Sequence, residues 1–178
     1  MAESKPIKGK VCLWPHLSGV GGPTSFYLKM QEGLKLRGIP VARHPLEDGC
    51  EVVLLIGGSS RVLDLWRARQ RGVRIVQRLN GMNWVHRRRF TGVRHFINSE
   101  RNNMLLAGVR RWLTDGIVYQ SGFSQTWWNQ MFQATPAVEC VVYNGVDTAA
   151  FVPGDARQLP EDKIRLLVVE GHLGGGHE

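Results

Sequence analysis

The sequence predicts an α/β fold in which a mainly parallel sheet carries helices on both faces. Short apolar runs alternate with segments whose apolar residues recur at helical spacing. The run at 52–56 is apolar throughout, as expected for a strand that is covered on both faces. Short polar turns separate the two kinds of segment, and this alternation is typical of parallel sheets.

The individual elements follow from these patterns in chain order. The expected strands span residues 10–15, 39–43, 52–56, 73–77, 116–120, 139–143 and 164–170. The expected helices span residues 24–37, 61–71, 96–113 and 124–132. Thr24 or Ser25 is expected to cap the first helix, and Gly38 is expected to end it. Residues 78–92 contain an Asn-Gly pair and an arginine run, and we expect them to form a loop.

The composition excludes several classes of protein. The chain has 178 residues, of which 43% are hydrophobic and 21% charged, which is ordinary for a globular domain. It has no apolar run long enough to span a membrane, and its polar, basic first residues do not resemble a secretory signal. Cys12, Cys50 and Cys140 are widely spaced and odd in number, which argues against disulfides or a zinc site and favours a reducing cytoplasm. Each cysteine is expected to be a small core residue.

The net charge of +8 is unevenly distributed along the chain. Residues 61–111 hold 13 arginines but only Asp64 and Glu100 as acids, so this segment carries +11 and the remainder −3. Such a segment indicates an anionic partner, either phosphates, anionic lipid headgroups or nucleic acid, with a solvated arginine-rich helix face as the alternative. Nucleic acid is the less favoured partner, because aromatic residues are not interleaved with the basic ones as a base-stacking surface requires. The residues expected to meet an anionic membrane surface are Arg87, Arg88, Arg89 and Arg94.

A glycine-containing turn, Gly19 to Pro23, lies between the first predicted strand and the first predicted helix. Backbone N–H groups at a helix N-terminus favour anions, and glycine lets a phosphate approach closely. The turn is not a P-loop, because no Gly-Lys-Ser/Thr follows, and it lacks the third glycine of the dinucleotide fingerprint. Arg43 ends the second predicted strand, where that fingerprint has an acidic residue, so an NADP-binding redox domain remains an alternative.

Five segments together resemble the family-four retaining glycosyltransferases, which have the GT-B fold. They are the paired glycines Gly21 and Gly22, the Leu-x-x-Arg-Gly helix end within 34–41, the strand and helix of 115–124, the Asn-Gly-Val-Asp-x-x-x-Phe motif of 144–151, and the strand and glycine loop of 164–176. They occur in the order and spacing of that family. The resemblance implies two Rossmann-like domains that face each other across a cleft.

This resemblance also implies a domain organisation. Residues 1–151 would form the N-terminal acceptor-side domain, 152–163 a linker, and 164–178 the first strand and glycine loop of a truncated C-terminal donor domain. The full-length protein would move a sugar from a nucleotide-sugar to a saccharide or lipid-linked acceptor, and this chain would be inactive alone. We expect a cytoplasmic protein and leave open whether it attaches peripherally to the inner membrane face.

The resemblance assigns site residues as well. Gly21 and Gly22 match the family's donor-phosphate loop. The residues expected at the acceptor cleft are His16, Arg78, Asn80, Gly81 and Trp84. The nucleotide-sugar is a co-substrate, no metal or further cofactor is implied, and no catalytic residue is assigned.

Overall fold

The structure is a computed structural model that describes residues 7–149 and 152. The chain divides into two compact units, Met1–Tyr143 and Asn144–Glu178. In the second unit the Ala149 amide donates to Asp147 Oδ1 over 2.9 Å. The predicted final strand and glycine loop, and the predicted linker apart from Val152, lie outside the described residues.

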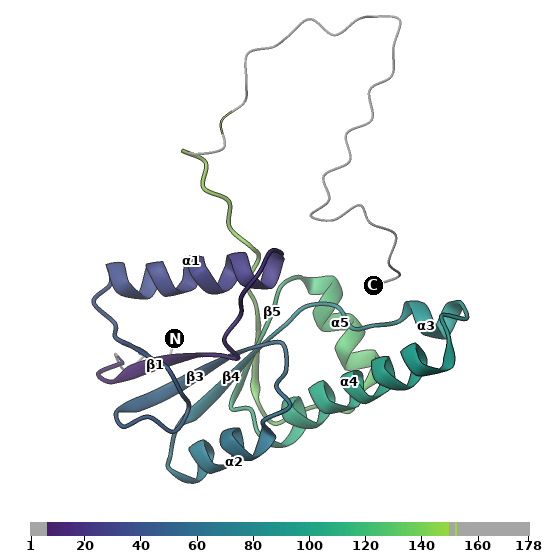
Figure 1. The fold of residues 1–178 in the computed structure, drawn as a ribbon, viewed down its shortest axis with the longest axis horizontal. Coiled ribbons are helices and arrows are strands. Elements are labelled where there is room, and N and C mark those ends of the chain that lie inside the picture. Colours follow the sequence, from purple (N-terminus) through teal and green to yellow (C-terminus); the bar gives the residue numbers. More distant parts are fainter. Residues whose placement is uncertain (1–6, 150–151, 153–178) are drawn as a thin grey trace, which may run out of the picture. The chain divides into compact units, whose positions relative to one another are not determined.

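Six strands of the first unit form one parallel sheet, which confirms the predicted α/β class (Figure 1). They are β1 (Lys10–Trp14), β2 (Val41–Ala42), β3 (Cys50–Ile56), β4 (Arg74–Leu79), β5 (Gly116–Tyr119) and β6 (Val138–Val141). Their order is β2-β1-β3-β4-β5-β6, and all neighbouring pairs are parallel. The strand order reverses between β1 and β3. In open α/β sheets, ligands bind at such a reversal, beyond the carboxyl ends of the strands.

Helices cover both faces of this sheet, as the sequence predicts, and the fold is Rossmann-like. The helices are α1 (Gly22–Leu36), α2 (Val62–Gln70), α3 (Val85–Arg88), α4 (Val93–Trp112) and α5 (Gly122–Met131). Figure 1 shows α1 on one side of the sheet and α2 and α4 on the other. Tyr27 of α1 packs with Leu13 on one face, whereas Leu65 of α2 and Val109 of α4 pack with Leu55 on the opposite face.

The packing of β3 explains why residues 52–56 are all apolar. Val53 and Leu55 join the core beneath α2 and α4, while Leu54 and Ile56 join the core beneath α1. Successive side chains of a strand point to opposite faces, so a strand between two helical layers packs against a helix on each face.

The start of α1 differs from the prediction. The helix begins at Gly22, and Gly21 is its N-cap, with no side-chain hydrogen bond to the cap. Neither Thr24 nor Ser25 caps it, so that expectation was wrong. Gly21 has φ of 135°, a conformation that side chains with a Cβ rarely adopt, and Pro23 presets the first turn. The turn chemistry of glycine and proline therefore starts this helix earlier than a hydroxyl cap would.

The predicted loop at 78–92 was also partly wrong. Strand β4 continues through Leu79, so Arg78 belongs to the sheet, and α3 forms within the remainder. Gln77 and Arg78 are both buried although polar. Gln77 Nε2 donates to the Gly57 carbonyl over 2.9 Å, so its burial is stabilised by a partner 20 residues away in sequence. A hydrophobicity pattern cannot anticipate such a partner.

The cysteine prediction holds for two of three residues. Cys12 and Cys50 are buried in the core, but Cys140 is exposed on β6, which lies at the edge of the sheet. All three are free thiols.

Helix α4 is longer than the strands it covers. It has 20 residues and so spans about 30 Å. Its buried residues begin at Ser99, and the preceding turn has none. Figure 1 shows α3 and the first part of α4 extending away from the sheet. None of the helices in residues 7–149 is both long and apolar enough to cross a membrane.

Candidate functional site

The turn between β1 and α1 lies at the reversal in strand order. Trp14 Nε1 donates to Ser59 Oγ over 3.1 Å, which ties the end of β1 to the turn after β3. Gly21 and Gly22 are exposed, and a Cβ added at Gly22 would meet nothing within 4 Å. The first backbone N–H groups of a helix have no partner inside it. The start of α1 therefore offers backbone donors and open space for an anion.

His16 anchors this turn through both ring nitrogens. Its Nε2 lies 2.8 Å from the Arg43 carbonyl, which can only accept, so Nε2 carries a proton. In the neutral ring, Nδ1 then accepts from the Tyr27 hydroxyl over 2.8 Å. Burial raises the pKa of Tyr27, so its hydroxyl stays protonated at neutral pH. With both nitrogens engaged, His16 is placed to position the turn rather than to act as a general base.

A buried cation lies against the second turn of α1. The Arg78 side chain is 7% exposed, and its Cζ lies 3.6 Å from the centre of the Phe26 ring. This is a cation–π contact. Burial lowers the pKa of the Arg78 guanidinium by desolvation, yet an arginine keeps its charge at neutral pH. The positive guanidinium and the positive end of α1 thus reinforce each other.

The next loop along this edge, residues 80–84, is held at three points. Trp128 Nε1 donates to the Asn80 carbonyl over 2.7 Å. The amide side chain of Asn103 donates to the Asn83 carbonyl over 2.7 Å and accepts from its N–H over 3.2 Å. Between these points Met82 is buried in the core. The backbone of this loop is therefore fixed from α4 and α5, while the Asn80 side chain and Gly81 face solvent.

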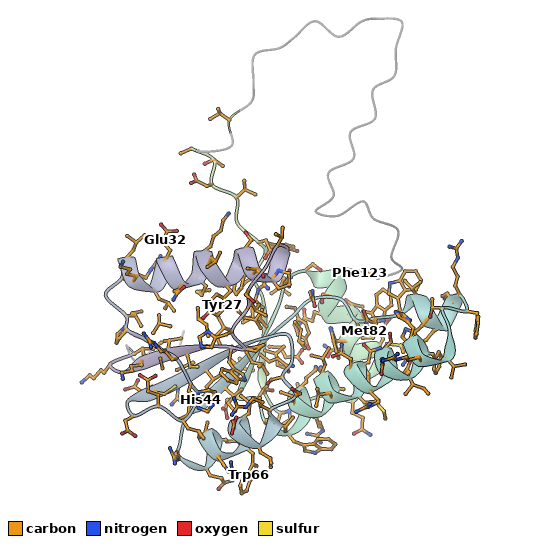
Figure 2. All side chains as sticks on the ribbon, in the orientation of Figure 1. Tyr27, Glu32, His44, Trp66, Met82 and Phe123 are labelled. Atoms are coloured by element: carbon orange, nitrogen blue, oxygen red, sulfur yellow. The ribbon has the colours of Figure 1, made fainter. Side chains whose placement is uncertain are left out.

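An exposed aromatic cluster, formed by Trp84, Phe123 and Trp127, follows this loop. The rings of Trp84 and Trp127 lie 5.8 Å apart, and Phe123 meets Trp127 edge-on at 5.1 Å. Trp84 is 45% exposed and Phe123 is 68% exposed. Figure 2 shows Phe123 near the start of α5. The aromatic cluster thus presents a partly open apolar surface beyond β4 and β5.

The two neighbouring tryptophans of α5 have different roles. Trp128 is fully buried in the core, whereas Trp127 is half-buried and belongs to the aromatic cluster. Successive helical positions differ by about 100°, so only one of two adjacent residues faces the sheet. This spacing is the sequence signal that could have separated Trp127 from Trp128.

The predicted site residues reach the carboxyl edge in two groups. His16, Gly21 and Gly22 lie at the turn into α1, with Arg78 at the end of β4. Asn80, Gly81 and Trp84 follow in the next loop. Sequence reasoning missed three residues, namely Phe26, Phe123 and Trp127. Within residues 7–149, no group of three or more His, Cys, Asp or Glu side chains is arranged to hold a metal ion.

One of the four arginines expected to meet an anionic membrane forms an ion pair within the chain. Arg87 contacts Glu100 through two bonds of 2.5 and 2.8 Å, and His86 Nε2 lies 2.6 Å from Glu100 Oε1. The Arg87 guanidinium, followed by His86, holds the pKa of Glu100 at about 2. Because Arg87 and His86 belong to α3 and Glu100 to α4, this cluster fastens α3 onto α4.

Replacing Glu100 with glutamine is expected to reduce stability in a pH-dependent way. The folded pKa of Glu100 is lowered from 4.5 to about 2, so its contribution is present above pH 4.5 and is lost as the pH falls through 2. Solvent screens this partly exposed cluster, so we expect a loss of about 1 kcal/mol at neutral pH. Urea unfolding at several pH values measures it. An E100Q deficit that is equal at neutral pH and near pH 2 would contradict the assignment.

A separate apolar groove of about 560 Å³ lies between α2 and α4. Its lining includes Leu63, Trp66, Met104 and Trp112, and no titratable side chain lines it. Trp66 points away from the sheet (Figure 2). The groove offers no group for acid–base or anion chemistry, so the candidate site remains at the carboxyl edge.

Comparison of the chain with protein-family models, curated proteins and solved structures found no match. A Rossmann-like fold supports many functions, so the function has to be argued from the site.

Proposed function

We propose that this chain is the acceptor-binding domain of a retaining glycosyltransferase. The full-length enzyme would move a sugar from a nucleotide-sugar to a saccharide or lipid-linked acceptor. The observation that carries the proposal is the presence, at one edge of the sheet, of an anion-favouring turn and an exposed aromatic cluster. The motif order that resembles family-four glycosyltransferases adds independent support.

The turn at Gly21 and Gly22 suits the donor phosphates. In sugar transfer, the bond from the anomeric carbon to the diphosphate breaks while the acceptor oxygen bonds to that carbon. Negative charge develops on the diphosphate oxygen as its bond to the sugar breaks, and this oxygen then takes up the proton of the acceptor hydroxyl. Preorganised donors and cations stabilise such developing charge. The backbone N–H groups at the start of α1 and the buried Arg78 meet this requirement.

The aromatic cluster suits a sugar acceptor. A sugar ring has an apolar C–H face, and an indole ring offers a flat apolar surface of matching size. The loop that carries Trp84 is fixed by Asn103, Met82 and Trp128, so binding would order few additional groups. A preorganised site loses less conformational entropy when the ligand binds. These contacts support a saccharide as the acceptor.

The alternative of an NADP-binding redox domain is less well supported. The Arg43 amide donates to Glu47 Oε2 over 2.8 Å, so a carboxylate lies beside the residue that would bind the ribose phosphate. The hydrogen bond from Lys10 lowers the pKa of Glu47, which keeps this carboxylate negative. The Glu47 carboxylate would therefore repel the negatively charged ribose phosphate of NADP.

A donor-panel assay tests the proposal. The 178-residue chain is compared with the protein extended through its natural reading frame, each incubated with a panel of nucleotide-sugars and saccharide acceptors. We expect nucleotide release by the extended protein and none by this chain, because the remaining donor contacts would belong to a second domain. Sugar transfer by the 178-residue chain alone would contradict the expectation that this chain is inactive. A folded extended protein that neither binds nor turns over any nucleotide-sugar would overturn the proposal.

A further inference from the structure

The arginine tip, defined as residues 85–97, is an exposed surface that combines basic and apolar side chains. It comprises α3, the following turn and the first turn of α4. Phe90 is 89% exposed, and Val93 and Ile97 are also exposed. Large apolar side chains are costly to leave in water, so their grouping at a projecting end calls for a partner.

The charges of the tip are of one sign. Residues 85–97 contain four arginines and no aspartate or glutamate. Arg87 is paired with Glu100, whereas no ion pair with a described residue is formed by Arg88, Arg89 or Arg94. Other arginines of the basic segment have internal roles, as Arg110 does with Glu139. Positive charge that remains unneutralised is therefore concentrated beside Phe90.

The tip is also held rigidly from within. The His86 side chain is fully buried, bonds Glu100 and packs edge-on against Phe96 at 5.1 Å. The contacts of Glu100 with His86 and Arg87 fasten α3 to α4. The exposed groups are thus displayed on a supported surface at the end of α4 that extends from the sheet (Figure 1).

We propose that the arginine tip binds the surface of an anionic lipid bilayer. Arg88, Arg89 and Arg94 contact lipid phosphates, and Phe90 enters the boundary between headgroups and acyl chains. Arginine and aromatic side chains are suited to these two layers. The aliphatic side chains of Val93 and Ile97 favour a bilayer over nucleic acid. They are stabilised by contact with hydrocarbon, but they can neither stack on a nucleic-acid base nor form a hydrogen bond with it. The inference does not depend on the proposed transferase activity.

The expected effects follow from the two kinds of contact. Three arginines near an anionic surface contribute about 100-fold to the partition coefficient at low salt, and salt screens this contribution. Burial of one phenylalanine contributes about tenfold. Replacing Arg88, Arg89 and Arg94 with glutamine should therefore abolish most binding, while F90S should lower it tenfold at any salt concentration.

Vesicle co-sedimentation of the full chain tests the proposal. The probes are vesicles of phosphatidylcholine alone, vesicles of phosphatidylcholine with phosphatidylserine, and single- and double-stranded oligonucleotides as competitors. A control variant, K29Q/K35Q/R37Q, removes the same charge from exposed positions on α1 and its C-cap. Because the substituted tip residues are exposed, all variants should fold, and thermal unfolding verifies this.

We expect the wild type and the α1 control to bind the phosphatidylserine vesicles, and the triple tip variant to bind about 100-fold more weakly. If the α1 control lost as much vesicle binding as the triple tip variant, binding would depend on net charge and not on the tip. Equal binding to vesicles without phosphatidylserine would overturn the role of the arginines. Tighter binding of oligonucleotides than of anionic vesicles would assign the tip to nucleic acid instead.

Discussion

Replacing Arg110 with methionine is expected to destabilise the fold by about 4 kcal/mol, measured by urea unfolding. The Arg110 side chain is 1% exposed, although it carries a charge. Its guanidinium donates to the Tyr119 hydroxyl, the Gln133 carbonyl and Glu139 Oε1 over 2.8–2.9 Å. Methionine retains much of the volume, but it removes all of these hydrogen bonds and leaves the Glu139 carboxylate without its positive partner. An unpaired buried charge costs more than the pair contributes.

Among the partners of Arg110, Glu139 is destabilised most by this substitution, because its carboxylate is charged. Burial would raise its pKa, but hydrogen bonds from Asn129, Tyr119 and Gln125, together with the Arg110 charge, outweigh burial and keep its pKa below the usual value. Burial raises the pKa of Tyr119 to about 12, so its hydroxyl remains a donor to Glu139. Strand β6 has no fully buried residue. The network around Arg110 is therefore a main attachment of this edge strand to α4 and α5.

Two further variants isolate the buried charge. Arg111 is the neighbouring residue but is only half-buried, so R111M should change stability by less than about 0.5 kcal/mol. The double variant R110M/E139M removes both charges and should recover part of the loss, as apolar replacements of buried pairs do. If R110M and R111M had equal stability, the network would not hold the edge of the sheet.

Replacing Arg78 with methionine is expected to lower kcat/KM of the extended transferase by about 10² to 10³, the usual effect of removing one group that stabilises developing negative charge. Urea unfolding of R78M measures separately how much the Arg78 side chain contributes to stability. Desolvation lowers the pKa of Arg78, which means that its folded environment disfavours the charged form. The aliphatic part of methionine can still pack against Phe26. A loss of activity in an R78M enzyme that still unfolds cooperatively would therefore report on the site rather than on folding.

Arg74 provides the matched control for this experiment. It lies on the same face of β4, four residues earlier, and its side chain is exposed. R74M should leave both kcat/KM and the urea midpoint unchanged, since it removes a charge remote from the carboxyl edge. A folded R78M enzyme with full activity would exclude Arg78 from the donor-phosphate site.

The sequence by itself determined the order and type of the main elements. Apolar runs such as 52–56 and helical spacing in 96–113 are properties of residues close together in the chain, and the structure contains β3 and α4 there. The same local patterns placed Gly21 and Gly22 at a strand-to-helix turn. Element identity was predictable because backbone geometry imposes its period on neighbouring side chains.

The candidate site was only partly predictable from these patterns. Trp84 was identified beyond the fourth strand, but its contact with Trp127 joins residues that are brought together by the packing of α5. Of the run Arg87 to Arg89, only Arg87 has an acidic partner in the described chain, Glu100. Composition gave the total charge but could not say which arginines would stay unpaired.

The tertiary structure alone decided where the buried polar groups lie. Arg78 was expected in a loop, yet it is a strand residue stacked on Phe26 of a helix far away in the sequence. Arg110 meets Glu139 across 29 positions. Any local sequence pattern predicts that a charged side chain is exposed to solvent. Its burial becomes favourable only when residues distant in the sequence supply its partners.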